Sequence, residues 1–389
     1  MSSKLVIVWS RARLDTEASH GGDRSSHRSR STIPCPHRLE LTMTSMRRPR
    51  WKPVLAGLSM SLLLLSGCNP ARGGDQQRFE LRFSHVTSVS TPKGLAADYF
   101  ADKVEEKSEG RIEVEVFPNS ELYGDKDEMQ AIQSNAVQVL APASAKFTTI
   151  APSLQVLDLP FIFDEPDEIP EVASPDTEIG KAIYANPDLE ANGLKVLGLW
   201  DAGMKQIHSN NKTLTPEDLK DRKYRIQPSD VLRTQFETWG GVPTPLAFAE
   251  VYSGLQQGLI DGGENTYSNI ESQNMHTVQK YVTELDHGYV GYILTVNKRW
   301  YDELPHDLQT AVNEAAGEAS EFNRVEAQKV NAEAKRIIEE SGNTEIIVPS
   351  KKQRQAFKDL VVPSEYERYR DVIGPKVVDE LLERNEERS

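Results

Sequence analysis

The sequence predicts an α/β protein of two domains joined by one long helix. Three observations lead to this fold class. Strand and helix patterns alternate along residues 80–142, a second such series occupies 194–290, and residues 306–342 run almost without helix breakers. Alternation of this kind is typical of sheets covered by helices. A chain of 389 residues is long enough to bury two separate cores.

The first domain opens with a strand followed by a well-marked helix. Residues 80–86 (ELRFSHV) alternate in polarity, and the next helix has Thr91 as N-cap, Pro92 in its first turn and Gly110 as stop signal. The order strand, helix, strand predicts a mainly parallel sheet, because parallel neighbours need a crossover between them. The remaining expected elements are a strand at 111–118, a helix around 126–134 and a buried strand at 137–142.

The second domain has the same mixed character and ends in the long helix. Over 306–342 a helix of roughly 35 residues would extend about 50 Å, more than the diameter of one domain, so we expect it to bridge both. The other expected strands are 194–200, 205–209, 223–227 and 289–301, and the other expected helices are 230–241 and 249–263.

The N-terminal region reads as an export signal and not as part of the fold. Residues 43–67 carry a basic stretch and then an apolar run of about a dozen residues, too short for a permanent membrane span. The run ends in Leu-Ser-Gly-Cys, which resembles a bacterial lipobox, so we expect a lipid anchor on Cys68. Residues 68–78 form a polar tether, and residues 1–42 look like non-native or disordered upstream sequence.

The charge of the exported part excludes one class of partner. Without residues 1–67 the chain keeps 34 basic and 55 acidic side chains, a formal net charge of −21. Binding of nucleic acid through a basic face is therefore not expected. No cysteine follows Cys68, so an intramolecular disulfide is not expected either.

The sequence also lacks the motifs of common catalytic sites. It has no glycine-rich phosphate loop, no GxSxG, no HExxH and no Cys/His cluster, and "GDKDE" at 124–128 lacks the spacing of a calcium loop. We therefore expect no metal, no cofactor and no enzymatic activity. An exported α/β protein of this kind is expected to bind a ligand.

One charged residue stands at an informative place. Arg225 lies near the end of the strand 223–227, just before the turn Gln227-Pro228-Ser229. Taken alone, a solvated charge on a strand face explains it. The sequence around it gives a second explanation, because residues 200–290 resemble the substrate-binding proteins of tripartite ATP-independent periplasmic (TRAP) transporters. The resemblance rests on "FAEVYSGLQQGLIDGGEN", "GLWDAGMKQ", "ASAKF", "SQNMHTVQKY" and "DHGYVGY", most similar to the branch that binds four-carbon dicarboxylates.

The resemblance implies a two-lobed, periplasmic-binding-protein-like fold with a hinge and a ligand cleft. Arg225 would then pair its guanidinium fork with a ligand carboxylate, which lysine cannot match. Asn265 would bond the same carboxylate or merely cap a helix end. Phe248 would pack beside the ligand or belong to the core.

A second carboxylate needs a second cation, and several residues are candidates. These are Lys205 in "GMKQ", Lys146 in "ASAKF" and Lys126 in "GDKDE". His85, at the end of the first strand, would donate to the same carboxylate or cap the strand. His287 would support Arg225 from behind.

The resemblance also implies the partners. The expected role is delivery of a dicarboxylate such as malate, succinate or fumarate to a small and a large membrane subunit. Alternatives are a receptor for a monocarboxylate, keto acid or sugar acid, a ligand-sensing module, and an exported α/β enzyme. We expect lobe I to comprise residues 79–202 plus 291–330, and lobe II residues 203–290 plus 331–389.

Overall fold

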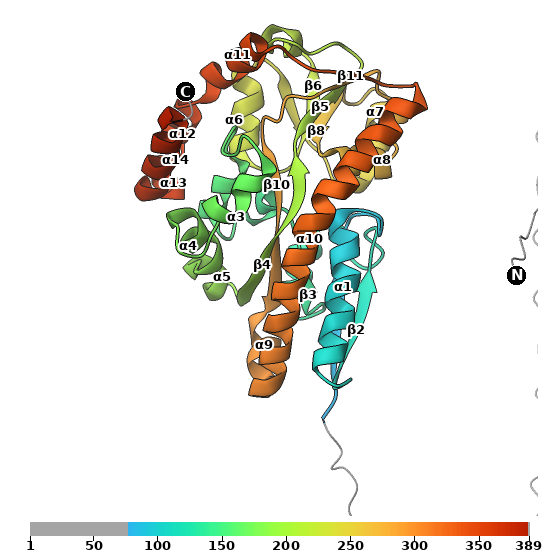
Figure 1. Cartoon of the computed structure of the whole chain (residues 1–389), viewed down its shortest axis with the longest axis vertical. Helices are drawn as coiled ribbons and strands as arrows, with labels where there is room; N and C mark the ends of the chain where they lie inside the picture. Colours follow the sequence, from blue (N-terminus) through green and yellow to red (C-terminus); the bar gives the residue numbers. More distant parts are fainter. Residues whose placement is uncertain (1–76, 388–389) are drawn as a thin grey trace, which may run out of the picture. The chain divides into compact units, whose positions relative to one another are not determined.

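The computed structural model of the chain describes residues 77–387. These residues form two β-sheets covered by helices, so the predicted α/β class is confirmed (Figure 1). The predicted signal peptide and Cys68 lie outside the described residues. Within 77–387, every helix is too short or too polar to cross a lipid bilayer.

The first sheet has five strands in the order β2-β1-β3-β10-β4, and we call the part built on it lobe I. β1 pairs in parallel with β2 and β3, as predicted, whereas β10 runs antiparallel to β3 and β4. The sheet is therefore mixed, because β10 returns to it from the second lobe and enters from the opposite end. Its strands are β1 (Phe79–Ser84), β2 (Ile112–Phe117), β3 (Val139–Leu140), β4 (Leu194–Met204) and β10 (Tyr289–Asn297).

The second sheet has six strands in the order β11-β9-β5-β8-β6-β7 and defines lobe II. The helix predicted at 249–263 is much shorter here, because Gly258 takes a positive φ of 69° and ends it. The glycines that follow enter a strand instead. The strands are β5 (Gln206–Ser209), β6 (Lys223–Ile226), β7 (Val242–Pro245), β8 (Gly262–Asn265), β9 (Tyr281–Thr283) and β11 (Glu345–Ile347).

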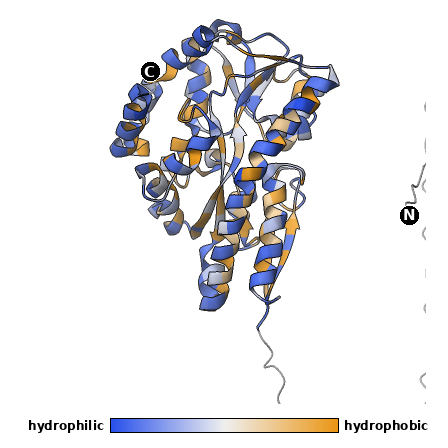
Figure 2. Cartoon of the chain, in the orientation of Figure 1, coloured by the Kyte–Doolittle hydropathy of each residue, from blue (hydrophilic) through white to orange (hydrophobic). Residues whose placement is uncertain are grey.

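Helix starts that the sequence marks with a capping residue are found at the predicted positions. α1 (Pro92–Lys107) begins at its expected N-cap, where the Thr91 hydroxyl accepts from the Gly94 amide at 3.2 Å. Hydrophobic and hydrophilic residues alternate along the helices (Figure 2), and the buried positions of α1 include Ala97, Phe100 and Val104. The shorter helices are α2 (Glu128–Gln133), α3 (Ile169–Val172), α4 (Glu178–Tyr184), α5 (Pro187–Ala191), α6 (Asp230–Thr238), α7 (Val251–Gln256), α8 (Tyr267–Ser272) and α9 (Lys298–Glu303).

The long helix α10 (His306–Ser341) belongs to both lobes. It runs beside α1 and β4 and continues past α8 (Figure 1). Its first half contributes Leu308 and Val312 to the core of lobe I, and its second half contributes Ala334 and Ile338 to the core of lobe II. The prediction that this helix bridges two domains therefore agrees with the packing.

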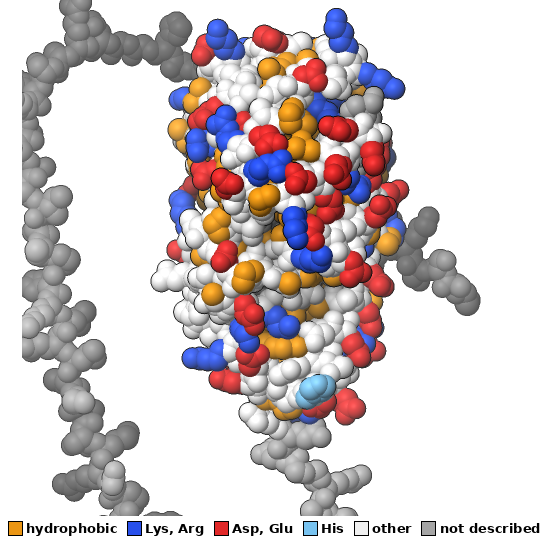
Figure 3. All heavy atoms as spheres, turned by 90° about the vertical axis from the view of Figure 1, so that its left-hand side faces the viewer, with side chains coloured by type: hydrophobic (Ala, Val, Ile, Leu, Met, Phe, Trp, Pro, Cys, Tyr) orange, Lys and Arg blue, Asp and Glu red, His pale blue; other side chains and the backbone are white. Residues whose placement is uncertain are grey.

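The C-terminal helices depart from the predicted lobe boundaries. α11 (Lys351–Val361) packs in lobe II, where Phe357 shares a core with Trp239. The following segment joins the core of lobe I instead, through residues such as Tyr366 and Leu381. Its helices are α12 (Ser364–Arg368), α13 (Arg370–Ile373) and α14 (Pro375–Glu387). On the face that carries these helices, acidic and basic side chains are interspersed (Figure 3).

Candidate functional site

A small polar cavity of about 20 Å³ lies between the two lobes. Lobe I contributes the loop after β1, α1, α2, η1 (Ser144–Phe147) and β10, and lobe II contributes β6, β8, α8 and the turn before α7. The residues that line it are Val86, Thr87, Lys93, Asp125, Glu128, Ala143, Lys146, Arg225, Gln227, Phe248, Asn265, Asn269, Val290 and Tyr292. Three of these side chains are cationic and two are acidic.

Arg225 lines this cavity from the third position of β6. Its side chain is buried, with 3% of the residue's surface exposed, and its Nε donates to the Leu246 carbonyl at 2.9 Å. Burial lowers the pKa of the guanidinium, while Asp125 and Glu264 act against that shift. The bond through Nε fixes the plane of the guanidinium, so that its two terminal nitrogens remain available for an acceptor in the cavity.

Asn265 ends β8 and lies beside Arg225 in the cavity wall. Its Oδ1 accepts from the Asn269 side chain at 2.8 Å and from the Thr266 amide at 3.0 Å. The N-cap of α8 is Thr266, so Asn265 is not the cap. Asn269 also donates to the Tyr292 hydroxyl at 3.2 Å, which ties the asparagines of lobe II to β10 of lobe I. Since its Oδ1 is occupied, the Asn265 amide nitrogen is the group left to donate to a ligand.

Lys146 and Asp125 form a buried ion pair in the cavity wall, 2.9 Å apart. The second oxygen of Asp125 accepts from the backbone amide of Phe248 in lobe II. Burial opposes ionisation of Asp125, but the Lys146 ammonium and the Phe248 amide outweigh it and hold its pKa below the usual value. Phe248 also packs in the core of lobe II beside Val251, so it belongs both to that core and to the cavity lining.

Lys93 and Glu128 complete the charged lining, and the sequence analysis singled out neither. The Lys93 ammonium donates to the Ala141 carbonyl at 3.2 Å and lies 3.9 Å from the centre of the Tyr292 ring. Burial lowers the pKa of Lys93 to about 8 and raises that of Glu128 to about 7. Both groups therefore titrate near neutral pH.

The order of apolar residues in α1 indicates that Lys93 is buried. The buried face of this helix includes Ala97, Phe100 and Val104, and Lys93 lies four residues before Ala97 on that same face. A lysine on the apolar stripe of an amphipathic helix is rare unless its charge has a partner. No comparable pattern marks Glu128, because α2 spans only six residues.

Lys205, one of the three lysines predicted as the second cation, lies outside the cavity lining. Its ammonium pairs with Glu264 at 2.8 Å, and both side chains are buried. The other oxygen of Glu264 accepts from His287 Nε2 at 2.9 Å. Burial raises the pKa of Glu264, but Lys205 and His287 more than offset this and lower it to about 2. His287 thus acts on Glu264, which in turn lies near Arg225.

Two further predicted ligand groups also lie outside the cavity lining. The Lys126 side chain is 70% exposed and pairs with Glu250 across the lobes at 2.9 Å. Its neighbour Asp125 takes the inward position. His85 is buried beside Thr87, with its Nδ1 3.3 Å from the threonine hydroxyl. Burial and the nearby Lys93 lower the pKa of His85 to about 3, so it carries no charge at neutral pH.

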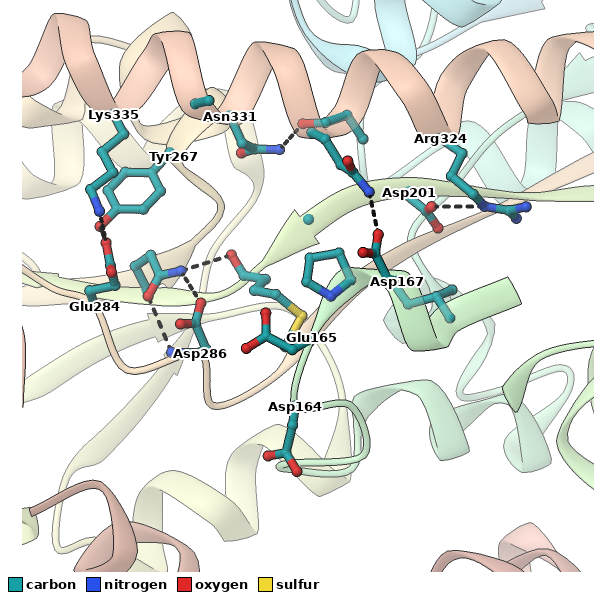
Figure 4. Close-up of a pocket in the computed structure, with 18 residues that line it drawn as sticks. Asp164, Glu165, Asp167, Asp201, Tyr267, Glu284, Asp286, Arg324, Asn331 and Lys335 are labelled. Carbon is teal, nitrogen blue, oxygen red and sulfur yellow. Dashed lines mark hydrogen bonds and ion pairs between the residues drawn. The ribbon is translucent and has the colours of Figure 1, made fainter. Parts of the chain in front are cut away.

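A larger cavity of about 530 Å³ lies between α10 and the end of β4 (Figure 4). Its titratable lining is mainly acidic, and its two cations are already paired, Arg324 with Asp201 at 3.5 Å and Lys335 with Glu284. An anion entering it would meet an excess of negative charge, so this cavity is unsuited to a carboxylate. The acidic lining residues are Asp164, Glu165, Asp167, Asp201, Glu284 and Asp286.

Comparisons with known proteins agree with this geometry. The C4-dicarboxylate-binding periplasmic protein DctP of Rhodobacter capsulatus is 39% identical over 284 residues, 73% of this chain and 84% of the relative. The crystal structure of a TRAP periplasmic solute-binding protein from Shewanella oneidensis with bound succinate superposes with a TM-score of 0.75 at 35% identity, covering 78% of this chain and 98% of that one.

A more distant structure has a different ligand. The sugar acid binding protein DctPAm from Advenella mimigardefordensis, in complex with galactonate, has a TM-score of 0.75 at 26% identity, covering 81% of this chain and 100% of that one. The sequence profile of one family matches residues 83–370. The resemblance to TRAP substrate-binding proteins is thereby confirmed: the chain belongs to the bacterial extracellular solute-binding proteins of family 7.

Proposed function

We propose that this chain is the extracytoplasmic solute receptor of a TRAP transporter, and that it binds a C4-dicarboxylate in the cavity between its lobes. The observation that carries the proposal is the convergence of three buried cations, Arg225, Lys93 and Lys146, on one cavity. Buried cations favour an anionic ligand, and their number favours one with two carboxylates. The receptor is proposed to be non-catalytic and to deliver its ligand to a small and a large membrane subunit.

Arg225 and Asn265 are proposed to hold the first carboxylate. The guanidinium is oriented by its bond to Leu246, and the Asn265 amide adds a donor from the neighbouring strand. Lys93 and Lys146 are proposed to hold the second carboxylate, because both line the same cavity from lobe I. The two carboxylates would then bind to different lobes, which couples ligand binding to closure of the lobes.

The size of the cavity and the contacts across it indicate that the two lobes are closed in this structure and must separate to admit a ligand. A volume of about 20 Å³ holds little more than one water molecule. A four-carbon diacid is several times larger, so the ligand must enter while the lobes are apart. Three bonds join the lobes: the Phe248 amide donates to Asp125, Lys126 donates to Glu250, and the Thr148 hydroxyl donates to the Pro228 carbonyl at 3.1 Å.

The proposal is tested by calorimetry and thermal melts with a panel of acids. Succinate, malate or fumarate should bind and raise Tm by several degrees at a hundredfold excess over Kd. Butyrate and pyruvate should barely change Tm, because they leave a buried cation unpaired. Tighter binding of galactonate or a monocarboxylate than of any C4-dicarboxylate would favour the alternative receptor. Turnover of any panel member would favour an enzyme.

A matched pair of variants tests the role of Arg225. Arg225→Lys keeps the charge but loses the fork, and Arg225→Ala removes the charge; Arg233→Lys, on the exposed face of α6, is the control. Truncation of a buried ion pair costs about 3–5 kcal/mol, roughly a hundredfold to several thousandfold in affinity. A loss below about tenfold for Arg225→Ala would contradict the assignment.

We further propose that Cys68 carries a lipid anchor that holds the receptor at the membrane. The support is the sequence of the preceding segment, a basic stretch and an apolar run that end at this cysteine. A mature bacterial lipoprotein carries more than one acyl chain, enough for stable attachment. Cys68→Ala should release the protein from membrane fractions after export. Recovery of the unaltered protein only in the soluble fraction would contradict the anchor.

A further inference from the structure

The charges around the cavity do not balance once a dicarboxylate is bound. Three cations line it, Lys93, Lys146 and Arg225, and two acids, Asp125 and Glu128. With both acids ionised, the empty site has one positive charge in excess, and a dianion reverses that excess to one negative charge. Uncompensated charge in a closed site is costly, so the bound state favours uptake of one proton.

Glu128 differs from Asp125 in having no fixed partner. It is the first residue of α2, lines the cavity, and has only 2% of its surface exposed. Among residues 77–387, no side chain or backbone group forms a hydrogen bond or an ion pair with its carboxyl group. Asp125, by contrast, accepts from Lys146 and from the Phe248 amide, which favour its ionised form. Glu128 is therefore the acid that is free to accept the proton.

The surroundings of Glu128 place its titration near neutral pH. Burial raises its pKa and Asp125 adds to the rise, whereas Lys146 and Lys93 oppose it, and the result is about 7. Of the other groups around the cavity, Lys93 lies closest in titration, because burial lowers its pKa to about 8, so it keeps its own proton at pH 7 and takes up part of one at pH 8. The pKa of Tyr292 is raised to about 12 by burial, that of His85 is lowered to about 3 by burial and Lys93, and Arg225 stays protonated.

We propose that Glu128 binds the dicarboxylate as a neutral acid, donating its carboxyl proton to a ligand oxygen, and that binding above neutral pH takes up one proton from solution. This inference rests on the proposed function, since it needs a dianionic ligand in the cavity. The proton comes from the solvent when the lobes close and returns to it when the ligand leaves. No covalent bond changes in either step.

A pH dependence of affinity follows, and its sign is fixed. Below the pKa of Glu128 in the free protein the acid is already neutral, so Kd does not change with pH as long as the ligand stays fully ionised. Above that pKa the binding of each ligand also takes up a proton from solution. Kd therefore rises by up to tenfold per pH unit. The receptor should therefore bind more tightly at pH 7 than at pH 8.

Calorimetry with succinate at pH 8 measures the proton directly. Titrations in two buffers with different enthalpies of ionisation, phosphate and Tris, give the number of protons taken up from the difference in heat. We expect the wild type to take up close to one proton more than Glu128→Gln, in which the remaining uptake comes from Lys93. The amide of that variant can still donate to the ligand, so it should bind succinate about tenfold more tightly than the wild type at pH 8. Glu121→Gln, an exposed glutamate upstream in the chain, is the matched control and should behave as the wild type.

The outcomes separate this inference from the function on which it rests. Binding of succinate by the wild type with equal heats in both buffers would overturn the role of Glu128 and leave the receptor function standing. Equal proton uptake by Glu128→Gln and the wild type would also overturn it, because the proton would then go to another group, such as Lys93. Absence of binding for every C4-dicarboxylate in the panel would instead overturn the proposed function. The wild-type measurement needs no variant, so a folding defect in Glu128→Gln cannot mask the result.

Discussion

Replacing Glu264 with glutamine should destabilise the protein more than any exposed ion pair does. The carboxylate is buried and accepts from Lys205 at 2.8 Å and from His287 at 2.9 Å. Its pKa falls from 4.5 to about 2 on folding. At about 1.4 kcal/mol per pH unit, that shift corresponds to about 3 kcal/mol of stability at neutral pH. The variant also leaves the Lys205 ammonium buried without its counter-charge, for which about 3–5 kcal/mol is typical.

The pH dependence has a defined direction. Because folding lowers the pKa of Glu264, its contribution is present above 4.5 and is lost as the pH falls toward about 2. The stability difference between wild type and Glu264→Gln should therefore be largest at pH 6–8 and shrink toward pH 3. Urea unfolding at several pH values measures it, and at neutral pH we expect a fall in Tm of roughly 6–15 °C.

Two control variants test the reasoning. Glu345→Gln removes a partner of Lys212 from a pair in which both side chains are about half exposed, and should barely change Tm. Adding Lys205→Met to Glu264→Gln removes the unpaired charge and should restore part of the lost stability. A loss below about 1 kcal/mol for Glu264→Gln, or one that does not change with pH, would refute the role of this network.

Three further predictions concern residues around the cavity. A Cβ at Gly263 would lie 2.9 Å from His208 Nε2 and 3.4 Å from the Cβ of Arg225. Gly263→Ala should therefore destabilise the protein by about 1–3 kcal/mol and weaken succinate binding. Unchanged affinity in calorimetry would mean that Arg225 tolerates the shift. Lys126→Ala should change the Kd for succinate by no more than about threefold, because its pair with Glu250 is exposed; a tenfold change would make Lys126 a ligand group after all. Thr91→Ala removes the N-cap of α1 and should cost about 1 kcal/mol in urea unfolding, with little effect on Kd.

Local chemistry explains which parts of the fold the sequence could predict. Thr91 and Pro92 mark the start of α1, and the run without breakers after residue 306 marks α10. The direction of β10 could not be read in this way, since parallel and antiparallel neighbours use the same buried run of residues. The same holds for α12–α14, whose apolar faces show that they pack but not against which lobe.

In the candidate site, too, some residues could be placed from the sequence and others could not. The surroundings of Arg225 and Asn265 in the sequence were specific enough to predict that both lie in the cavity wall. Lys205 also looked suitable by type and spacing. Its pairing with Glu264 depends on strands β5 and β8 lying side by side, which is a long-range contact. Charge and position in the chain therefore could not distinguish a lysine that faces the cavity, such as Lys93, from one that supports its wall.

The packing of the last helices on lobe I has a consequence for biogenesis. Tyr366 donates to the Pro160 carbonyl at 2.7 Å, and Leu381 shares a core with Leu154 and Ile179. A secreted chain leaves the translocation channel with its C-terminus last. The domain whose strands emerge first thus lacks part of its core until almost the whole polypeptide has been released. Completing the core of lobe I therefore joins segments about 200 residues apart in sequence, and contacts of such long range form slowly. Until α12–α14 have packed, the apolar surface of lobe I that they cover stays exposed, which makes the unfinished lobe prone to association.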